Sequence, residues 1–129
     1  MGTYLMDTNV GIDLLGGLLS SKVIKWLDNQ ILESNISISV INEIELLGFN
    51  TTLDEAQDLQ DLINNVIVIE LSRDVVNQTI QLKKIKKMKL PDAIIAATAL
   101  VHNLTIVSRN KSDFKNINGL KCIDPYVDI

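Results

Sequence analysis

Apolar residues follow two patterns along the chain, which predict strands and helices in turn. Short runs rich in β-branched residues, either unbroken or alternating with polar residues, predict buried strands. These runs are Thr3 to Met6, Ile36 to Val40, Val66 to Ile69, Leu104 to Val107 and a short last one at Cys122-Ile123. Segments with apolar residues three or four positions apart predict helices. These segments are Val10 to Leu15, Ser20 to Ile31, a stretch through Glu45-Leu46-Leu47, Leu53 to Ile63, Arg73 to Met88 and Ala93 to His102.

The order of these segments predicts the architecture. Helices lie between successive strands, which is typical of parallel strands joined by helical crossovers. We therefore predict an α/β three-layer sandwich, in which helices flank a mostly parallel central sheet. The 129 residues fit one domain, 1–129, because no repeat, low-complexity segment or linker divides them.

Composition narrows the chemistry that this domain can perform. Hydrophobic residues make up 47% of the chain and charged residues 22%, a balance typical of globular proteins. The lone Cys122 forms no internal disulfide, and no Cys/His cluster is present to hold structural zinc. We interpret His102 as a helix-end residue, and with no second histidine in the chain a Ser/His or Cys/His nucleophile scheme lacks its base. We expect a cytoplasmic protein, since no secretory signal and no run of about 20 apolar residues is present.

The net charge of −4 argues against a nucleic-acid binder, but the basic residues are unevenly distributed. None lies between Lys25 and Arg73, whereas five lysines crowd the segment before Asp92. Such a cluster suits a phosphate-bearing substrate; it is equally typical of the solvated face of a helix. The five lysines are Lys83, Lys84, Lys86, Lys87 and Lys89.

Four acidic residues lie at the ends of apolar, strand-like runs or at the start of a buried helix: Asp7, Glu45, Asp92 and Asp113. In open α/β sheets, sites form beyond the carboxyl ends of the strands, so these side chains are expected to converge. Convergent carboxylates repel one another unless a cation neutralises them. Hard oxygen ligands favour Mg²⁺ or Mn²⁺, so the sequence predicts a divalent-metal site.

Each acid also has a purely structural interpretation. Asp7 could accept hydrogen bonds from the turn of helix that follows it. Glu45 could be the third residue of a capping box begun at Asn42, and Asp92 could complement a helix dipole. Asp113 could be a turn residue. The metal hypothesis therefore depends on all four acids occurring together.

Four ordered blocks of sequence resemble the motifs of PIN domains, and most closely those of VapC-type toxins. The Asp7-Thr8-Asn9 and Pro91-Asp92-Ala93 segments are the most specific parts of the resemblance. The blocks are Tyr4 to Val10, Ile38 to Leu46, Leu90 to Ala99 and Ile106 to Phe114. This resemblance implies a PIN-like fold whose acidic pocket binds Mg²⁺ or Mn²⁺ and hydrolyses RNA phosphodiester bonds with metal-activated water.

The resemblance assigns roles to individual residues. Asp7, Glu45 and Asp92 match the three main carboxylates of the family. Spacing from Ser39 favours Glu45 as the second acid, although Glu43 lies only two residues away and remains an alternative. On a helix the two side chains point to different faces.

The fourth acidic position departs from the fully acidic pattern of the family. Asn110 stands two residues after Ser108, and Asp113 supplies the nearest carboxylate. Either Asn110 or Asp113 can therefore occupy the fourth position of the metal site. The resemblance also implies that Thr8 or Asn9, together with Ser108, orients a carboxylate or a bound water.

The family further implies partners: an RNA substrate, with transfer RNA as one suggestion, an antitoxin that blocks the site, and a second toxin subunit in a homodimer. Two other functions compete with this interpretation. A catalytically inactive PIN-like scaffold that binds RNA or protein is suggested by the neutral Asn110. A phosphatase of the haloacid-dehalogenase type is disfavoured, because it needs an acid where Asn9 stands.

Overall fold

The computed structural model describes residues 3–129. Its centre is a five-stranded sheet in the order β3-β2-β1-β4-β5, and every pair of neighbouring strands is parallel. The strands are β1 (Tyr4–Met6), β2 (Ile36–Ser39), β3 (Ile67–Ile69), β4 (Thr105–Val107) and β5 (Lys121–Ile123). The all-parallel sheet confirms the prediction of helical crossovers, since parallel neighbours need a long connection.

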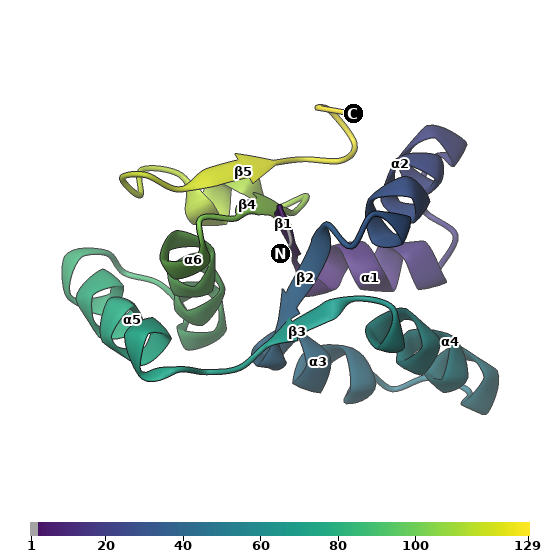
Figure 1. Ribbon diagram of the computed structural model, residues 1–129, viewed down its shortest axis with the longest axis horizontal. Helices are drawn as coiled ribbons and strands as arrows, with labels where there is room; N and C mark the ends of the chain where they lie inside the picture. The colour runs from purple at the N-terminus through teal and green to yellow at the C-terminus, as the bar shows by residue number, and fades with distance from the viewer. Residues whose placement is uncertain (1–2) are drawn as a thin grey trace.

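Helices cover both faces of the sheet, with α5 and α6 on one face and α1 to α4 towards the other (Figure 1). They are α1 (Thr8–Leu15), α2 (Ser21–Leu32), α3 (Val40–Leu47), α4 (Leu53–Asn64), α5 (Arg73–Ile85) and α6 (Leu90–His102). A short 3₁₀ helix, η1 (Lys111–Phe114), lies between β4 and β5. The predicted three-layer α/β sandwich is therefore confirmed.

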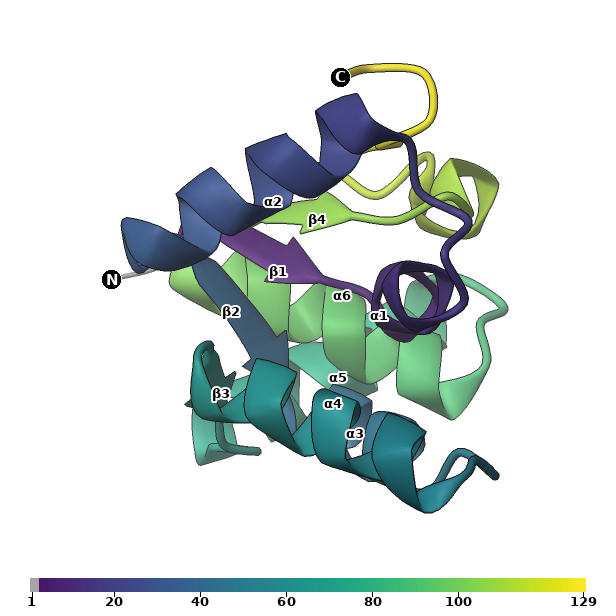
Figure 2. The ribbon, with the colours of Figure 1, turned by 90° about the vertical axis from the view of Figure 1, so that its right-hand side faces the viewer.

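Alternate residues of the central strands enter two separate hydrophobic cores. Leu5 and Ile106 pack with α5 and α6, whereas Met6 and Val107 pack with the helices of the other face. This follows from the two-residue period of a strand, which points successive side chains to opposite faces. Figure 2 looks onto one face of the sheet, with α2 in front of β1, β2 and β4 and with α6 behind them.

The end of α5 differs from the sequence prediction. The helix predicted from Arg73 to Met88 ends at Ile85, because Lys86 adopts an extended backbone with φ −145° and ψ 138°. Lys83 Nζ then donates a hydrogen bond to the Met88 carbonyl at 2.5 Å, which satisfies a carbonyl of the segment after α5. Lys83 and Lys84 thus lie in the last turn of α5, whereas Lys86, Lys87 and Lys89 lie in a loop and not on a helical face.

The carboxyl ends of β1 and β4 are level with each other in the sheet. Met6 pairs with Val107, so Asp7 and Ser108 are the first residues beyond the two strands. The Asp7 amide donates to the Val107 carbonyl at 2.9 Å and continues the ladder by one residue. No helix within residues 3–129 is long and apolar enough to cross a membrane.

Candidate active site

Asp7 is the N-cap of α1 and is held by three hydrogen bonds. The Thr8 amide donates to Oδ1 at 2.8 Å, while Asn9 Nδ2 and Ser108 Oγ donate to Oδ2 at 3.1 and 2.9 Å. The residue is 8% exposed. The expected hydrogen bond from the following turn is therefore present, but Ser108, which directly follows β4, also ties the carboxylate to the end of that strand. Capping alone does not account for this second attachment.

Ser108 is the centre of a small polar network at this edge of the sheet. Its hydroxyl donates to Asp7 and accepts hydrogen bonds from Asn9 Nδ2 at 3.1 Å and from the Asn110 amide at 3.0 Å. The Arg109 amide also donates to Asn9 Oδ1, at 3.4 Å. These contacts hold Asn9 and Ser108 against the Asp7 carboxylate, and their orienting roles stay a prediction. Asn110 takes part through its backbone amide.

Glu45 reaches the same region through Thr8. The Thr8 hydroxyl donates to Glu45 Oε1 at 2.7 Å and accepts from Asn42 Nδ2 at 3.1 Å. Asn42 Oδ1 in turn accepts from the Ser39 amide at 2.8 Å, as part of a capping box formed by Ser39 and Asn42. The alternative interpretation of Glu45 as the third residue of a box begun at Asn42 is therefore wrong. Glu43 has no such link to Asp7 within residues 3–129.

The position of Glu45 depends on a close approach of α1 to α3. Gly11 of α1 has no side chain, and a Cβ built there would lie 2.8 Å from Leu46 Cδ2. Leu46 is fully buried and neighbours Glu45 on α3. The glycine therefore lets the two helices come close enough for Thr8 and Glu45 to make contact.

Charges couple Asp7 to the other acids. Burial raises the pKa of the Asp7 carboxyl, and the negative charges of Asp92 and Glu45 raise it further. The hydrogen bonds from Ser108 and Thr8 oppose this rise because they stabilise the ionised form. The Asp7 carboxylate is thus held in place while burial and two neighbouring charges disfavour its ionisation.

Asp92 lies in the first turn of α6, two residues after Leu90. Burial raises the pKa of its carboxyl, and the charges of Asp113 and Glu45 add to the rise while Lys89 opposes it. Asp92 and Asp113 share a hollow of about 260 Å³. The remaining residues of that hollow are Lys86, Lys87, Met88, Lys89 and Ser112.

The structure therefore relates the four predicted acids in two pairs. Asp7 and Glu45 are linked through Thr8, while Asp92 and Asp113 line one hollow, and Asp92 lies within electrostatic reach of Asp7 and Glu45. Within residues 3–129, no three acidic, histidine or cysteine side chains form a group already closed around an ion position. A direct cage of four carboxylates is not assembled.

The oxygen donors nevertheless suit a hydrated divalent cation. Mg²⁺ usually binds proteins through one or two carboxylates and retains several waters, so it needs no closed cage. The negative charges of Asp7, Glu45 and Asp92 repel one another, and a bound divalent cation would neutralise them. The residues thus fit the ion by donor type and charge, and the set of metal ligands stays a prediction.

The sequence matches the family model described as the PIN domain over residues 4–120. The chain belongs to the PIN domain family. Solved structures agree: a toxin-antitoxin complex from Klebsiella pneumoniae contains a chain 32% identical to this one. The alignment covers 95% of this chain and 98% of that one, with a TM-score of 0.75.

Two further structures resemble this PIN domain mainly in fold. A chain of DNA-bound VapBC from Salmonella typhimurium is 22% identical, with a TM-score of 0.84, and the alignment covers 97% of this chain and 99% of that one. A chain of FitAcB from Neisseria gonorrhoeae is 23% identical, with a TM-score of 0.78 and coverage of 96% and 99%. A search among curated proteins found no match.

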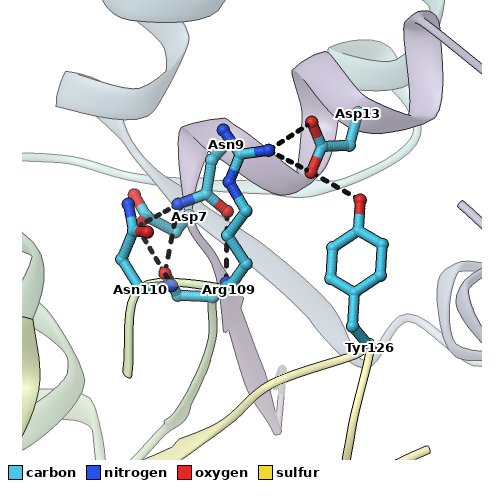
Figure 3. Close-up of polar contacts among 7 residues, drawn as sticks. Asp7, Asn9, Asp13, Arg109, Asn110 and Tyr126 are labelled. Carbon is cyan, nitrogen blue, oxygen red and sulfur yellow. Dashed lines mark hydrogen bonds and ion pairs between the residues drawn. The ribbon is translucent and has the colours of Figure 1, made fainter. Parts of the chain in front are cut away.

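Beside the predicted acids, this PIN domain has an ion pair that the sequence reasoning missed. Asp13 of α1 is 1% exposed, and Arg109 Nη1 donates to its two carboxylate oxygens at 2.9 and 3.0 Å. The Tyr126 hydroxyl donates to Asp13 Oδ2 at 2.7 Å, as Figure 3 shows. The available signal was an acid within the apolar helix Val10 to Leu15, since a buried acid requires a partner.

Proposed function

We propose that this PIN domain is a Mg²⁺- or Mn²⁺-dependent endoribonuclease and the toxin of a toxin-antitoxin pair. The observation that carries the proposal is the mutual repulsion of Asp7, Glu45 and Asp92 at the carboxyl end of the sheet. Burial and neighbouring negative charges raise the pKa values of Asp7 and Asp92, so their ionisation is costly unless something positive binds there. Membership of the PIN family and the 32% identical chain in a toxin-antitoxin complex support the same function.

In this proposal Asp7, Glu45 and Asp92 would hold the cation, with Asp113 or water completing its surroundings. When bound, the cation lowers the pKa of water and neutralises charge on phosphate oxygens. The chain contributes fixed geometry: Ser108 and Asn9 orient the Asp7 carboxylate, and Thr8 orients that of Glu45. Such orienting partners are expected to affect metal affinity nearly as strongly as the ligands do.

The lysine cluster would attract the RNA backbone next to this site. Three of its five members, Lys86, Lys87 and Lys89, line the hollow that contains Asp92 and Asp113. Lys86 Nζ also donates to the Lys115 carbonyl, which leaves Lys87 and Lys89 as the main phosphate contacts in our proposal. Lys83 binds the Met88 carbonyl, so we expect it to contribute less. Each phosphate contact adds a salt-dependent attraction that is independent of sequence.

The test is cleavage of total RNA by purified protein with Mn²⁺, with Mg²⁺ and with a chelator. We expect cleavage that needs the cation and that falls at least about a hundredfold in Asp7→Asn and in Asp92→Asn. Asp74→Asn is the matched control, because Asp74 also lies in the first turn of a helix but outside the site. Cleavage that survives both site substitutions, or the chelator, would refute the proposal. RNA binding without cleavage in the unmodified protein would instead favour the inactive scaffold.

A groove beside the C-terminal half of α1 supports the proposed protein partner. Two hollows of about 230 and 520 Å³ adjoin there, and both are lined by Leu14, Asp58 and Leu62. The larger also contains Leu32, which is 83% exposed. Asp28, Asp58 and Asp61 add negative charge to an apolar floor. We therefore propose an antitoxin segment that is amphipathic and carries basic residues, with a further cationic side chain reaching the acidic site.

This partner is tested with the protein encoded by the neighbouring reading frame. Burial of one leucine side chain contributes about 1.5–3 kcal/mol, so Leu32→Ser should weaken binding roughly 10- to 100-fold by calorimetry. Leu53→Ser is the control, because Leu53 is 90% exposed and lies outside both hollows. Equal affinities for the two variants would place the antitoxin elsewhere. The homodimer and the cytoplasmic location stay predictions.

A further inference from the structure

A buried carboxylate joins three segments that are distant in sequence. Asp13 belongs to α1, Arg109 follows β4, and Tyr126 follows β5. Both oxygens of Asp13 accept from Arg109 Nη1, and Oδ2 also accepts from the Tyr126 hydroxyl. Burial, followed by the contact with Asp13, raises the pKa of Tyr126, so its phenol is protonated at neutral pH and acts as the donor.

Arg109 lies in the segment that contributes to the candidate active site. This segment, residues 108–113, is called the site loop below. It contains Ser108, which binds Asp7, and Asp113, which shares a hollow with Asp92. Arg109 sits directly after Ser108, so a guanidinium fixed on α1 also limits where the Ser108 hydroxyl can lie. The Arg109 amide contacts Asn9 of the same helix at 3.4 Å.

The chain after β5 supports the site loop at a second point. This segment, residues 124–128, is called the C-terminal turn. Asp128 Oδ2 accepts from Lys111 Nζ of the site loop at 3.1 Å and from the Asp124 amide at 2.8 Å. The Tyr126 amide donates to Asp124 Oδ1 at 2.8 Å, which fixes the turn that presents the phenol. The C-terminal turn thus contacts the site loop through Lys111, and Tyr126 of the turn and Arg109 of the loop donate to the same Asp13 carboxylate.

We propose that the C-terminal turn is a brace for the active site, in which Asp13 and Tyr126 act as positioning residues through Arg109. The brace holds the site loop so that Ser108 and Asp113 stay in place for the proposed metal-dependent reaction, and to that extent it rests on the proposed function. The family match ends at residue 120, so the C-terminal turn lies beyond the matched residues.

Sharing a single acceptor makes the two contacts interdependent. Asp13 is 1% exposed, so its charge depends on Arg109 and Tyr126 in place of water. When the phenol hydroxyl is removed, Asp13 loses one of its donors, and Arg109 alone remains to hold the buried carboxylate. The site loop then opens more often, while β1 and β2, which the brace does not touch, remain as stable as before.

The test uses Tyr126→Phe, which removes the hydroxyl and keeps the ring. The control is Tyr4→Phe at the other tyrosine, whose ring packs against Trp26 at a centroid distance of 5.0 Å and which makes none of the hydrogen bonds of the brace. Two properties are measured in each full-length variant. Amide hydrogen exchange reports opening of the site loop, and electron paramagnetic resonance reports the fraction of Mn²⁺ bound at a series of concentrations.

We expect Tyr126→Phe to raise exchange of the loop amides roughly fivefold and to raise the Mn²⁺ dissociation constant severalfold, with no change in Tyr4→Phe. Unchanged loop exchange would overturn the brace. Faster exchange with unchanged Mn²⁺ binding would show a merely structural contact and would overturn the positioning role.

Both measurements are independent of RNA cleavage, so they distinguish failure of the brace from failure of the proposed function. An unmodified protein that binds Mn²⁺ but cleaves no RNA would refute the nuclease, while the exchange and binding data would still decide about the brace. Arg109→Lys adds a rescue test. Lysine keeps a positive charge beside the Asp13 carboxylate, so Arg109→Lys should retain part of the Mn²⁺ affinity that Arg109→Ala loses.

Discussion

Replacing Asp92 with asparagine removes one negative charge without removing a side-chain hydrogen bond, because Asp92 makes none within residues 3–129. Two interpretations of Asp92 predict opposite signs for the change in the free energy of unfolding. If the carboxylate serves only the dipole of α6, its loss should destabilise the protein by about 0.3–1 kcal/mol. If it belongs to a repulsive site, its loss should stabilise the protein.

The structure favours stabilisation in the absence of metal. Burial together with the charges of Asp113 and Glu45 outweighs the attraction of Lys89, since the net effect raises the pKa of Asp92. Because the side chain is only partly buried, solvent screens these charges and the gain should be at most about 1 kcal/mol. For a domain of this size the melting temperature rises by about 4 °C for each kcal/mol.

Metal should reverse the order of the two proteins. A ligand at about a hundred times its dissociation constant stabilises the folded state by about 2.7 kcal/mol, and the neutral amide that replaces the Asp92 carboxylate binds a cation more weakly. Thermal unfolding of both proteins, in chelator and over a series of Mn²⁺ concentrations, measures this. Asp74→Asn, the matched control at the start of α5, should lose stability through the helix dipole and keep the full response to Mn²⁺.

One combination of results would contradict a role of Asp92 in a repulsive metal site: Asp92→Asn unfolds at a lower temperature in chelator, as Asp74→Asn does, and both retain the stabilisation by Mn²⁺. That result would assign Asp92 to the helix dipole alone. A stabilised variant that no longer responds to Mn²⁺ would support the site.

Three further predictions concern the geometry and charge of the site. Thr8→Val should lower cleavage about 10- to 100-fold and reduce the free energy of unfolding by about 1–3 kcal/mol in chemical denaturation. The reason is that Glu45 loses its hydrogen-bond donor and buried Asn42 loses its acceptor. Thr8→Ser keeps the hydroxyl and should restore both activity and stability. In chelator, the gain in stability of the Asp7→Asn/Asp92→Asn double variant over the unmodified protein should grow as pH rises from about 3.8. Each folded pKa lies above its unfolded value of 3.8, so ionisation costs stability through that interval, and a pH-independent difference would contradict this. Gly11→Ala should lower the free energy of unfolding by about 1–3 kcal/mol and reduce cleavage, because the new Cβ would lie 2.8 Å from Leu46 Cδ2. Unchanged denaturation curves would mean that α1 and α3 can separate freely.

Local sequence was sufficient to predict most of the secondary structure. The strands and most helices follow from the spacing of apolar residues, which depends only on the geometry of each element. Asp7 and Ser108 could also be placed at strand ends, since each directly follows a buried run. The helix after Arg73 was predicted too long, because the extended backbone at Lys86 interrupts a pattern that continues in sequence.

Which side chains meet was decided by the tertiary structure. Spacing favoured Glu45 over Glu43, but the contact of Glu45 with Thr8 depends on the approach of α1 to α3 at Gly11. The pairing of Asp92 with Asp113 in one hollow likewise brings together a helix start and the 3₁₀ turn beyond β4.

The sequence by itself determined the alternation of elements, the acidic character of the strand ends and the family motifs. It did not reveal the partners of Asp13, which lie 96 and 113 residues away at Arg109 and Tyr126. The physical reason is that periodicity records which residues are buried in one element, whereas a hydrogen bond between distant segments depends on how the whole chain packs.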